Sequence, residues 1–274
     1  MSPAATGPLE ELRAMGLDTV DGAFACGDGQ DLVKGGLGHR RRTQLSLGDG
    51  RGGSRTVYLK RYGPEPLRWR LKRWWTYGPG KSPAAIEARA IAAARDAGLP
   101  TMEVLHWGQD AGGDGRSFII VSSVPGDALS RCMGAFLRNH AGDAAPAQLA
   151  VALGGLAGRL HRCGYVHRDF YTAHIFLDQA AGASLHLIDL ARMFRPKLRR
   201  FRWRVKDLAQ LKYSLPPGFV ETHWAALIDT YLWTLGGGAK DRPRLDLAVD
   251  AKARQIRARH DRRMKRHLMK AAMK

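Results

Sequence analysis

Residues 167–176 have the sequence HRDFYTAHIF, and the segments on either side of this stretch indicate the fold. It follows the run QLAVALGGLAGRLHRCG (148–164), which is typical of a helix that ends at a glycine. Asp169 is therefore expected in a loop after a helix, where a carboxylate can orient or accept a proton. An isolated HRD in a chain rich in Arg and His is more often a coincidence than a catalytic motif. The surrounding motifs are therefore needed to decide between the two.

A second carboxylate, Asp189, follows about twenty residues later in the segment IDL. The intervening HIFLDQAAGASLHLIDL (174–190) predicts two short strands around a Gly/Ala turn, so Asp169 and Asp189 are expected at the ends of neighbouring strands. Phosphoryl transfer requires one carboxylate that orients an attacking hydroxyl and another that holds Mg²⁺ on the nucleotide phosphates. The two residues together favour phosphoryl transfer over coincidence.

The first half of the chain predicts a small sheet. Four runs have the pattern of strands: RTQLSL (42–47), RTVYLKRY (55–62), MEVLHWG (102–108) and SFIIVSSV (117–124). The first two flank a glycine-rich turn and indicate a hairpin. Pro125-Gly126 then marks a boundary, beyond which the chain is mainly helical. We therefore expect an α+β protein, with a small sheet-rich lobe over residues 1–124 and a larger helical lobe over residues 125–274.

One helix in the first half is strongly predicted, over SPAAIEARAIAAARDAGLP (82–100), with Ser82 as N-cap and Gly98 beyond the C-terminus. Glu87 lies on this helix, and Lys60 lies on the strand that ends the hairpin. A lysine on such a strand can reach phosphate oxygens, and a helical glutamate can pair with it. Either residue alone is more often a solvated surface charge. The order Lys, Glu, HRD, IDL favours a phosphate site.

The glycine-rich GGLG (35–38) is a weaker indication of nucleotide binding. Gly35, Gly36 and Gly38 could let backbone N–H groups approach phosphates, but a hairpin turn explains these glycines almost equally well. Neither GxxxxGK[ST] nor GxGxxG occurs, so the sequence does not support a P-loop or a Rossmann dinucleotide site.

Composition limits the class of protein. The 274 residues carry a formal net charge of +19 with 45% hydrophobic residues, which is typical of a globular protein with a polyanionic partner. Three cysteines without metal-ligand spacing fit a reducing cytoplasm, so neither a disulfide nor structural zinc is expected. The N-terminal residues do not read as a signal peptide, and no apolar run approaches the ~18 residues of a membrane span. Any membrane contact is therefore expected at the surface.

Taken in order, the motifs resemble the lipopolysaccharide kinases of the Kdo/WaaP type, in particular their heptose-kinase branch. The matching segments are RRT (41–43), YLKRY (58–62), SPAAIEARAI (82–91), AGLPT (97–101), GYVHRDFYTAHIFL (164–177), LIDLAR (187–192) and RWRVKDLAQL (202–211). The resemblance implies a protein-kinase-like fold of two lobes, with ATP and Mg²⁺ as cofactors. It also implies transfer of the ATP γ-phosphate to a sugar hydroxyl, on heptose or Kdo, of the lipopolysaccharide inner core.

The same resemblance implies roles for individual residues. It makes Asp169 the catalytic base, with Arg168 and His167 of the same motif as further catalytic residues. It makes Asp189 a Mg²⁺ ligand, Lys60 a phosphate contact and Glu87 its partner. Adenine is expected to meet the backbone near Ser122 and Val124. Asp207 is expected to support the catalytic loop without reacting.

His174 stands where protein kinases have Asn, five residues after Asp169. The heptose-kinase branch resembles this chain in having His at this position, so the departure is from protein kinases and not from the family. His174 is a candidate metal ligand or phosphate neighbour, and a structural role is equally open at this point. A neutral imidazole is a poor ligand for Mg²⁺, which prefers oxygen.

Two basic segments could contact an anionic partner. LRWRLKRWW (67–75) predicts a helix with Leu67, Leu71 and Trp74 on one face and basic residues around them. The pattern favours an ordinary docked helix slightly over an interfacial helix at a membrane. The C-terminal segment (251–274) predicts electrostatic contact with an anionic membrane surface or nucleic acid, although no base-reading motif occurs. No specific nucleic acid is therefore expected.

A third basic segment, ARMFRPKLRRFRWRVK (191–206), directly follows IDL. Its candidate ligands for phosphates or acidic sugars are Arg192, Arg195, Arg199 and Arg200. The expected partner is thus a lipopolysaccharide core sugar or another anionic glycolipid, reached from the cytoplasm or the cytoplasmic face of the inner membrane. Two alternatives stay open: a kinase of the same fold acting on a protein or small molecule, and a non-catalytic basic module that binds membranes or nucleic acid.

Overall fold

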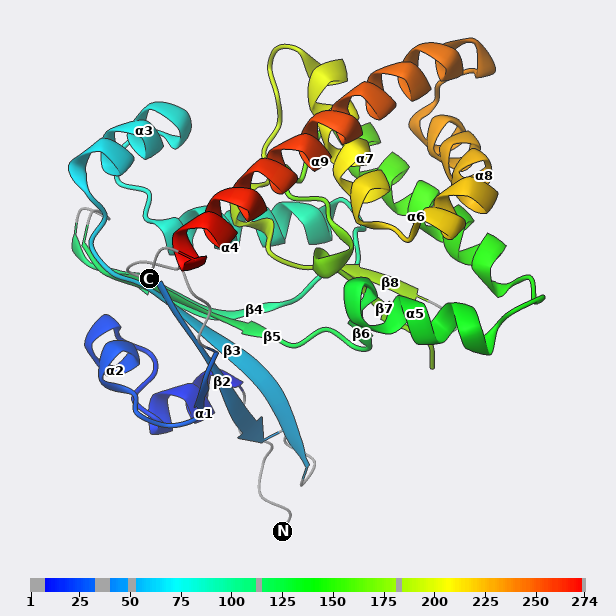
Figure 1. Ribbon diagram of the computed structural model, residues 1–274. Helices are drawn as coiled ribbons and strands as arrows, with labels where there is room; N and C mark the ends of the chain where they lie inside the picture. The colour runs from blue at the N-terminus through cyan, green and yellow to red at the C-terminus, as the bar shows by residue number, and fades with distance from the viewer. Residues whose placement is uncertain (1–7, 33–39, 49–52, 112–114, 181–183, 273–274) are drawn as a thin grey trace. The chain divides into compact units, whose positions relative to one another are not determined.

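The computed structural model describes residues 8–32, 40–48, 53–111, 115–180 and 184–272 (Figure 1). The chain divides into two compact units. The first unit comprises Met1–Asp96 and Thr101–Val124, and the second comprises Ala97–Pro100 and Pro125–Lys274. The first unit is built around the larger sheet and the second is mainly helical, so the predicted α+β class is confirmed.

The first unit is built on a five-stranded antiparallel sheet with the order β1-β2-β3-β5-β4. Its strands are β1 (Gln30–Asp31), β2 (Arg40–Gly48), β3 (Ser54–Tyr62), β4 (Val104–Gln109) and β5 (Ser117–Ser122). Its helices are α1 (Pro8–Ala14), α2 (Val20–Ala25), α3 (Leu67–Tyr77) and α4 (Pro83–Asp96). The predicted hairpin is present as β2 and β3, which pair from Arg40↔Tyr62 to Gly48↔Ser54.

The alternation of β3 separates an apolar face from a polar one. Val57 and Leu59 are fully buried in a core cluster that also contains Leu12 of α1 and Ala23 of α2. Because successive side chains of a strand point to opposite faces, Lys60 lies on the other side of the sheet from these two residues. The sequence pattern VYLK therefore places a lysine opposite the core that anchors its strand.

Helix α4 begins and ends as predicted. The amide of Ala85 donates to Ser82 Oγ at 3.1 Å, which caps the N-terminus. Gly98 has φ +68, a left-handed conformation that favours glycine after a helix. Small alanine residues fill much of the buried face of α4, and Glu87 is fully buried among them.

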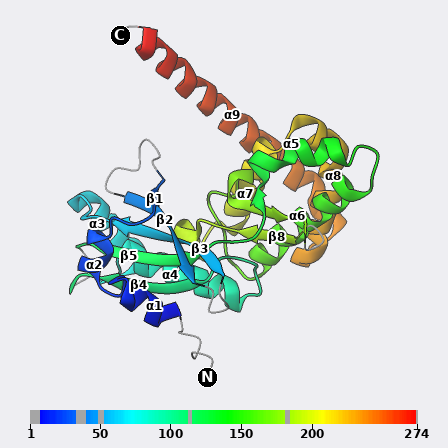
Figure 2. The ribbon, with the colours of Figure 1, turned by 90° about the horizontal axis from the view of Figure 1, so that it is seen from below.

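The second unit combines five helices with a small antiparallel sheet of order β6-β7-β8. The helices are α5 (Leu129–Asn139), α6 (Ala145–Arg162), α7 (Arg200–Ser214), α8 (Pro217–Leu235) and α9 (Arg242–Ala272). The strands are β6 (Asp127–Ala128), β7 (Ile175–Asp178) and β8 (Ser184–Leu187). The last two are the predicted pair of short strands after the HRD segment. Figure 2 shows α9 extending beyond the other helices of its unit.

Helix α6 leads directly into the HRD segment and is fixed by close packing on α8. A Cβ atom added at Gly154 would lie 2.2 Å from the carbonyl oxygen of Leu227, and one at Gly158 would lie 2.5 Å from Cβ of Thr234. Because these glycines are four residues apart, they share one face of α6 and let the two helix backbones approach. Within the described ranges, no helix combines the length and apolar character needed to cross a membrane.

Candidate functional site

The first unit contains a buried ion pair between β3 and α4. Lys60 Nζ lies 2.5 Å from Glu87 Oε1, and the two side chains are 10% and 0% exposed. The other carboxylate oxygen, Oε2, accepts a hydrogen bond from the hydroxyl of Tyr62. Buried charges are tolerated when they are paired and hydrogen-bonded in this way. The pairing expected from the sequence is present, and contact of Lys60 with phosphate stays a prediction.

The sequence motifs do not single out Tyr62, although a signal for it exists. Tyr62 follows Lys60 by two residues in YLKRY, and a period of two places both side chains on one face of β3. A buried glutamate has two oxygens to satisfy, so a second donor on the same strand face is the natural partner.

The predicted adenine contacts lie at the end of β5. The amide of Ser122 donates to the carbonyl oxygen of Glu103 at 2.9 Å, and the amide of Glu103 donates back to Ser122 Oγ at 2.9 Å. Contact of adenine with the backbone near Ser122 and Val124 stays a prediction. The candidate phosphate glycines Gly35, Gly36 and Gly38 lie outside the described residues.

In the second unit, the HRD segment is held by one buried carboxylate from α7. Asp207 accepts a hydrogen bond from the amide of His167 at 2.6 Å and another from the amide of Arg168 at 2.9 Å. Arg168 has φ +73, a conformation that is uncommon outside glycine and needs such support. The predicted supporting role of Asp207 is confirmed by these two bonds.

Two further side chains of α7 complete the support of this loop. The carbonyl oxygen of Arg168 accepts hydrogen bonds from Lys206 Nζ at 2.5 Å and Gln210 Nε2 at 2.8 Å. Gln210 Oε1 also accepts from the amide of Phe170 at 3.1 Å. Burial lowers the pKa of Lys206. Sequence reasoning missed Lys206 and Gln210, which flank Asp207 within about one helical turn in RWRVKDLAQL.

Arg168 and His167, both predicted to be catalytic, have contacts typical of positioning residues. The guanidinium of Arg168 lies over the rings of Phe194 and Trp203, at 5.4 and 5.5 Å from their centroids. His167 is buried, and its Nε2 lies 3.0 Å from the carbonyl oxygen of Ile188. Its Nδ1 accepts from the amide of Asp169 at 3.3 Å, and burial lowers its pKa. Both ring nitrogens are thus engaged in holding the loop.

Asp169 lies in contact with Arg192 of the following basic segment. Arg192 Nη1 is 2.9 Å from Asp169 Oδ1 and 2.8 Å from Oδ2. The pair is partly open to solvent, with the arginine side chain 51% and the aspartate side chain 22% exposed. Arg192, a predicted substrate ligand, is therefore adjacent to the predicted base and able to bring an anionic group close to it.

The other three candidate substrate arginines have different surroundings. The guanidinium of Arg195 lies 4.4 Å from the ring centroid of Tyr165. Arg200 Nε donates to the carbonyl oxygen of Pro196 at 3.4 Å. Arg199 is exposed and precedes α7 in a left-handed conformation with φ +56. Their predicted contact with substrate stays a prediction.

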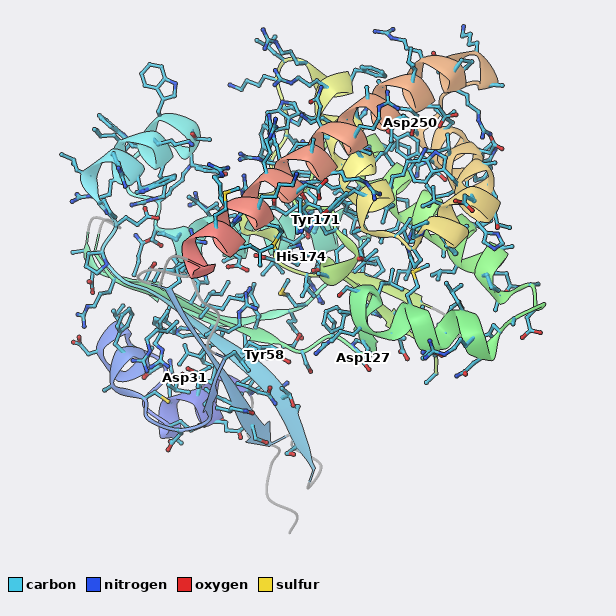
Figure 3. The ribbon with its side chains drawn as sticks, viewed as in Figure 1. Asp31, Tyr58, Asp127, Tyr171, His174 and Asp250 are labelled. Carbon is cyan, nitrogen blue, oxygen red and sulfur yellow. The ribbon has the colours of Figure 1, made fainter. Side chains whose placement is uncertain are left out.

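His174 links the two predicted carboxylates, and it lies one turn after Tyr171 on the loop (Figure 3). Its Nδ1 donates to the carbonyl oxygen of Asp169 at 2.8 Å, which leaves Nε2 facing Asp189 Oδ2 at 3.6 Å. Asp189 has φ +60, so its backbone is also in the left-handed region. The ring of His174 thus lies between the backbone of one acidic residue and the side chain of the other.

The residues around Asp189 fit a magnesium ion that keeps most of its own water. Mg²⁺ is commonly held by one or two carboxylates, water and substrate phosphates, and not by a full cage of protein ligands. The partly exposed carboxylate of Asp189 can supply one such oxygen. Among the residues that the structure describes, no three His, Cys, Asp or Glu side chains form a metal-binding cluster.

Comparisons with known proteins extend the sequence resemblance. The profile of the lipopolysaccharide kinase (Kdo/WaaP) family matches residues 36–231. The lipopolysaccharide core heptose(I) kinase WaaP of Pseudomonas aeruginosa is 32% identical over 142 residues, which are 48% of this chain and 52% of that protein. The chain thus spans about half the length of this curated relative.

A solved structure, WaaP in complex with acyl carrier protein, has a TM-score of 0.63 and 23% sequence identity. The match covers 89% of this chain and 95% of that chain. At this identity the likeness concerns the fold, and the predicted protein-kinase-like fold is confirmed.

Proposed function

This chain belongs to the lipopolysaccharide kinase (Kdo/WaaP) family, and we propose that it transfers the γ-phosphate of ATP to a sugar hydroxyl, on heptose or Kdo, in the lipopolysaccharide inner core. The observation that carries the proposal is the position of Asp169 on a loop bonded to Asp207, Lys206 and Gln210 of α7. A carboxylate on so constrained a loop is preorganised to orient a hydroxyl for attack.

Asp169 acts on the acceptor in this proposal. It orients the sugar hydroxyl in line with the γ-phosphate and takes the hydroxyl proton as the new O–P bond forms. The bond between the γ-phosphorus and the bridging oxygen breaks, ADP leaves, and the proton passes from Asp169 to solvent. Arg192, which touches both oxygens of Asp169, holds an anionic group of the acceptor beside the carboxylate.

The nucleotide is bound by residues of the first unit. Lys60 contacts phosphate oxygens, and Glu87 fixes the lysine in place through the ion pair. Adenine meets the backbone at Ser122 and Val124. Asp189 supplies an oxygen ligand to Mg²⁺, which, when bound, neutralises negative charge on the phosphates.

The charge of the chain supports an anionic acceptor. The segment after Asp189 contains Arg192, Arg195, Arg199 and Arg200, and the whole chain has a formal net charge of +19. Arginine binds phosphate and carboxylate with two donors at once, so a cluster of this kind suits acidic sugars or phosphorylated sugars.

The substitution Asp169→Asn tests the proposal with little change in shape. Purified protein with Mg-ATP and core oligosaccharide is expected to incorporate phosphate, and the variant is expected to bind ATP while transfer falls by about 10² to 10⁴. Asp178→Asn, on β7 of the same unit, is the matched control and is expected to keep the wild-type rate. Unchanged transfer by Asp169→Asn would overturn the role of the carboxylate.

The acceptor itself is tested by mass spectrometry of lipopolysaccharide from cells with and without an active copy of the gene. A phosphate missing from one core sugar identifies the substrate and hydroxyl. Phosphate found on proteins, with the lipopolysaccharide unchanged, would replace the sugar acceptor with a protein acceptor. Absence of any turnover of Mg-ATP would favour a non-catalytic binding module.

A further inference from the structure

Helix α3 (Leu67–Tyr77) exposes a large amount of apolar surface. All eleven of its residues are described, and eight of them are exposed. Its exposed fractions are 93% for Trp75, 65% for Leu67, 57% for Trp74, 51% for Leu71 and 48% for Trp69. Single exposed apolar residues are ordinary. Leu71, however, lies four residues after Leu67 and three and four residues before Trp74 and Trp75, so these four side chains share one face of the helix, and such a patch marks an interaction site.

The helix is held in place within its unit despite this exposure. Arg73 Nε donates to Glu65 Oε2 at 2.9 Å, and both side chains are largely buried. The same guanidinium donates to the carbonyl oxygen of Lys81, and the amide of Gly78 bonds to the carbonyl oxygen of Trp74. Arg73 therefore ties α3 to the segments before and after it, while the tryptophans remain outside. Figure 3 shows side chains of α3 standing clear of the sheet of the first unit.

The charges of α3 identify the chemistry of its partner. The helix LRWRLKRWWTY contains four basic residues and no acidic residue. Arg68 and Lys72 are exposed among the apolar side chains, and Lys72 Nζ lies 5.4 Å from the ring centroid of Trp69. Tryptophan is enriched where an apolar phase meets water, and long basic side chains can extend from such a position towards phosphate groups. This combination matches an anionic lipid surface.

A second copy of this chain fits the patch poorly. Docking α3 on α3 would bring their basic residues together, and each chain carries a formal charge of +19. An anionic bilayer instead offers headgroup phosphates for the cations and an apolar layer for the indoles in one surface.

We propose that α3 docks this protein on anionic phospholipid bilayers, with Leu67, Leu71, Trp74 and Trp75 inserted at the interface and Arg68 and Lys72 against headgroup phosphates. The docking requires neither nucleotide nor sugar acceptor, so it stands or falls independently of the proposed kinase activity. It would hold the protein at the surface where lipid-linked anionic acceptors are found.

The test is co-sedimentation of the full-length protein with vesicles of phosphatidylglycerol and phosphatidylethanolamine, compared with vesicles of phosphatidylcholine alone. Wild-type protein is expected to bind the anionic vesicles, with a blue shift of tryptophan fluorescence. The double variant Trp74→Ala/Trp75→Ala is expected to bind them at least about tenfold more weakly, because two interfacial aromatic side chains are removed.

The matched control is Trp233→Ala, which removes a tryptophan that is 82% exposed on α8. It is expected to bind vesicles like the wild type, and circular dichroism with thermal melting checks that each variant is folded. Arg68→Gln/Lys72→Gln is expected to reduce the preference for phosphatidylglycerol while the tryptophans still insert.

Salt separates α3 from the basic helix α9. High salt screens a purely electrostatic contact, so the binding that survives it is expected to depend on Trp74 and Trp75. Wild-type protein that ignores phosphatidylglycerol vesicles, or a Trp74→Ala/Trp75→Ala variant that binds them as tightly as the wild type, would overturn the proposal. A change from oligomer to monomer in the same variant, without a change in vesicle binding, would assign the patch to self-association instead.

Discussion

Two ion pairs, one in each unit, differ in their exposure to water. Lys60 and Glu87 are buried and share their site with the hydroxyl of Tyr62, whereas Asp169 and Arg192 are partly exposed. Removing one partner of a buried pair leaves an uncompensated charge, but an exposed pair contributes little to stability. The first pair is therefore a fixed part of the fold. The second lies partly in solvent, and the fold depends on it much less.

Glu87→Gln is expected to have the largest effect on stability. It leaves Lys60 buried without a countercharge, which costs about 3 to 5 kcal/mol of unfolding free energy. Urea denaturation followed by circular dichroism measures the change. Asp127→Asn, which removes a carboxylate from an exposed pair with Arg131, serves as the control and should change the unfolding free energy by less than about 1 kcal/mol. Equal effects of the two variants would remove the distinction between buried and exposed pairs.

Tyr62→Phe tests the same buried pair with a smaller expected loss of stability. The variant keeps the ring and removes the hydroxyl that donates to Glu87, so one oxygen of a buried carboxylate loses its donor. The expected loss is about 1.5 to 3 kcal/mol of unfolding free energy, the usual range for a hydrogen bond to a charged group. Tyr58→Phe, four residues earlier on the same face of β3, is the natural control. A Tyr62→Phe protein as stable as the wild type would show that the ion pair needs no second donor.

Arg192→Gln should separate function from stability. Because the Asp169 pair is partly exposed, the unfolding free energy is expected to change by less than about 1 kcal/mol. The KM for an anionic acceptor is expected to rise about tenfold, the effect of about 1.4 kcal/mol of lost binding. Steady-state kinetics with core oligosaccharide measures it, with Arg131→Gln as a control away from the loop. A large loss of stability without a change in KM would make this pair structural, like the one in the first unit.

The smallest expected effect is a dependence of stability on pH. Burial lowers the pKa of His167 and of His186 below the ordinary value of 6.5. The unfolded chain therefore takes up protons that the folded chain excludes, so stability is full above about pH 6.5 and declines as the pH falls towards the lowered values. Urea denaturation at about pH 7.5 and about pH 5.5 measures the decline. His186→Gln is expected to retain part of it, because His167 remains; a pH-independent wild type would contradict the assignment.

Much of the fold was predictable because its elements are set by local pattern. Alternation indicated the β2–β3 hairpin, and a serine cap with a following glycine delimited α4. The order of motifs also predicted the Lys60–Glu87 pair, and the resemblance to the Kdo/WaaP family implied the support from Asp207. The hairpin and the helix depend on periodicity and capping, which can be read from one segment at a time.

The remaining parts of the site depend on contacts between distant segments. Lys206 and Gln210 support the HRD loop through bonds to the carbonyl oxygen of Arg168, and these bonds depend on how α7 packs against that loop. The ion pair of Arg192 with Asp169 could not be predicted either, because the basic segment alone does not indicate which of its arginines contacts Asp169. For α3 the sequence favoured a docked helix only slightly over an interfacial helix, because exposure is a property of tertiary structure.

The bonds between the HRD segment and α7 also constrain how the protein is made. The amides of His167, Arg168 and Phe170 bond to side chains 40, 39 and 40 residues further along the chain. A ribosome therefore synthesises the HRD segment well before the helix that supports it, and in the meantime the left-handed turn at Arg168 lacks the bonds to α7. We expect these amides to gain protection from hydrogen exchange only when α7 has docked, among the last of their unit during folding. A nascent chain that ends before α7 would contain the whole HRD motif but lack the side chains of Asp207 and Gln210 that bond its amides.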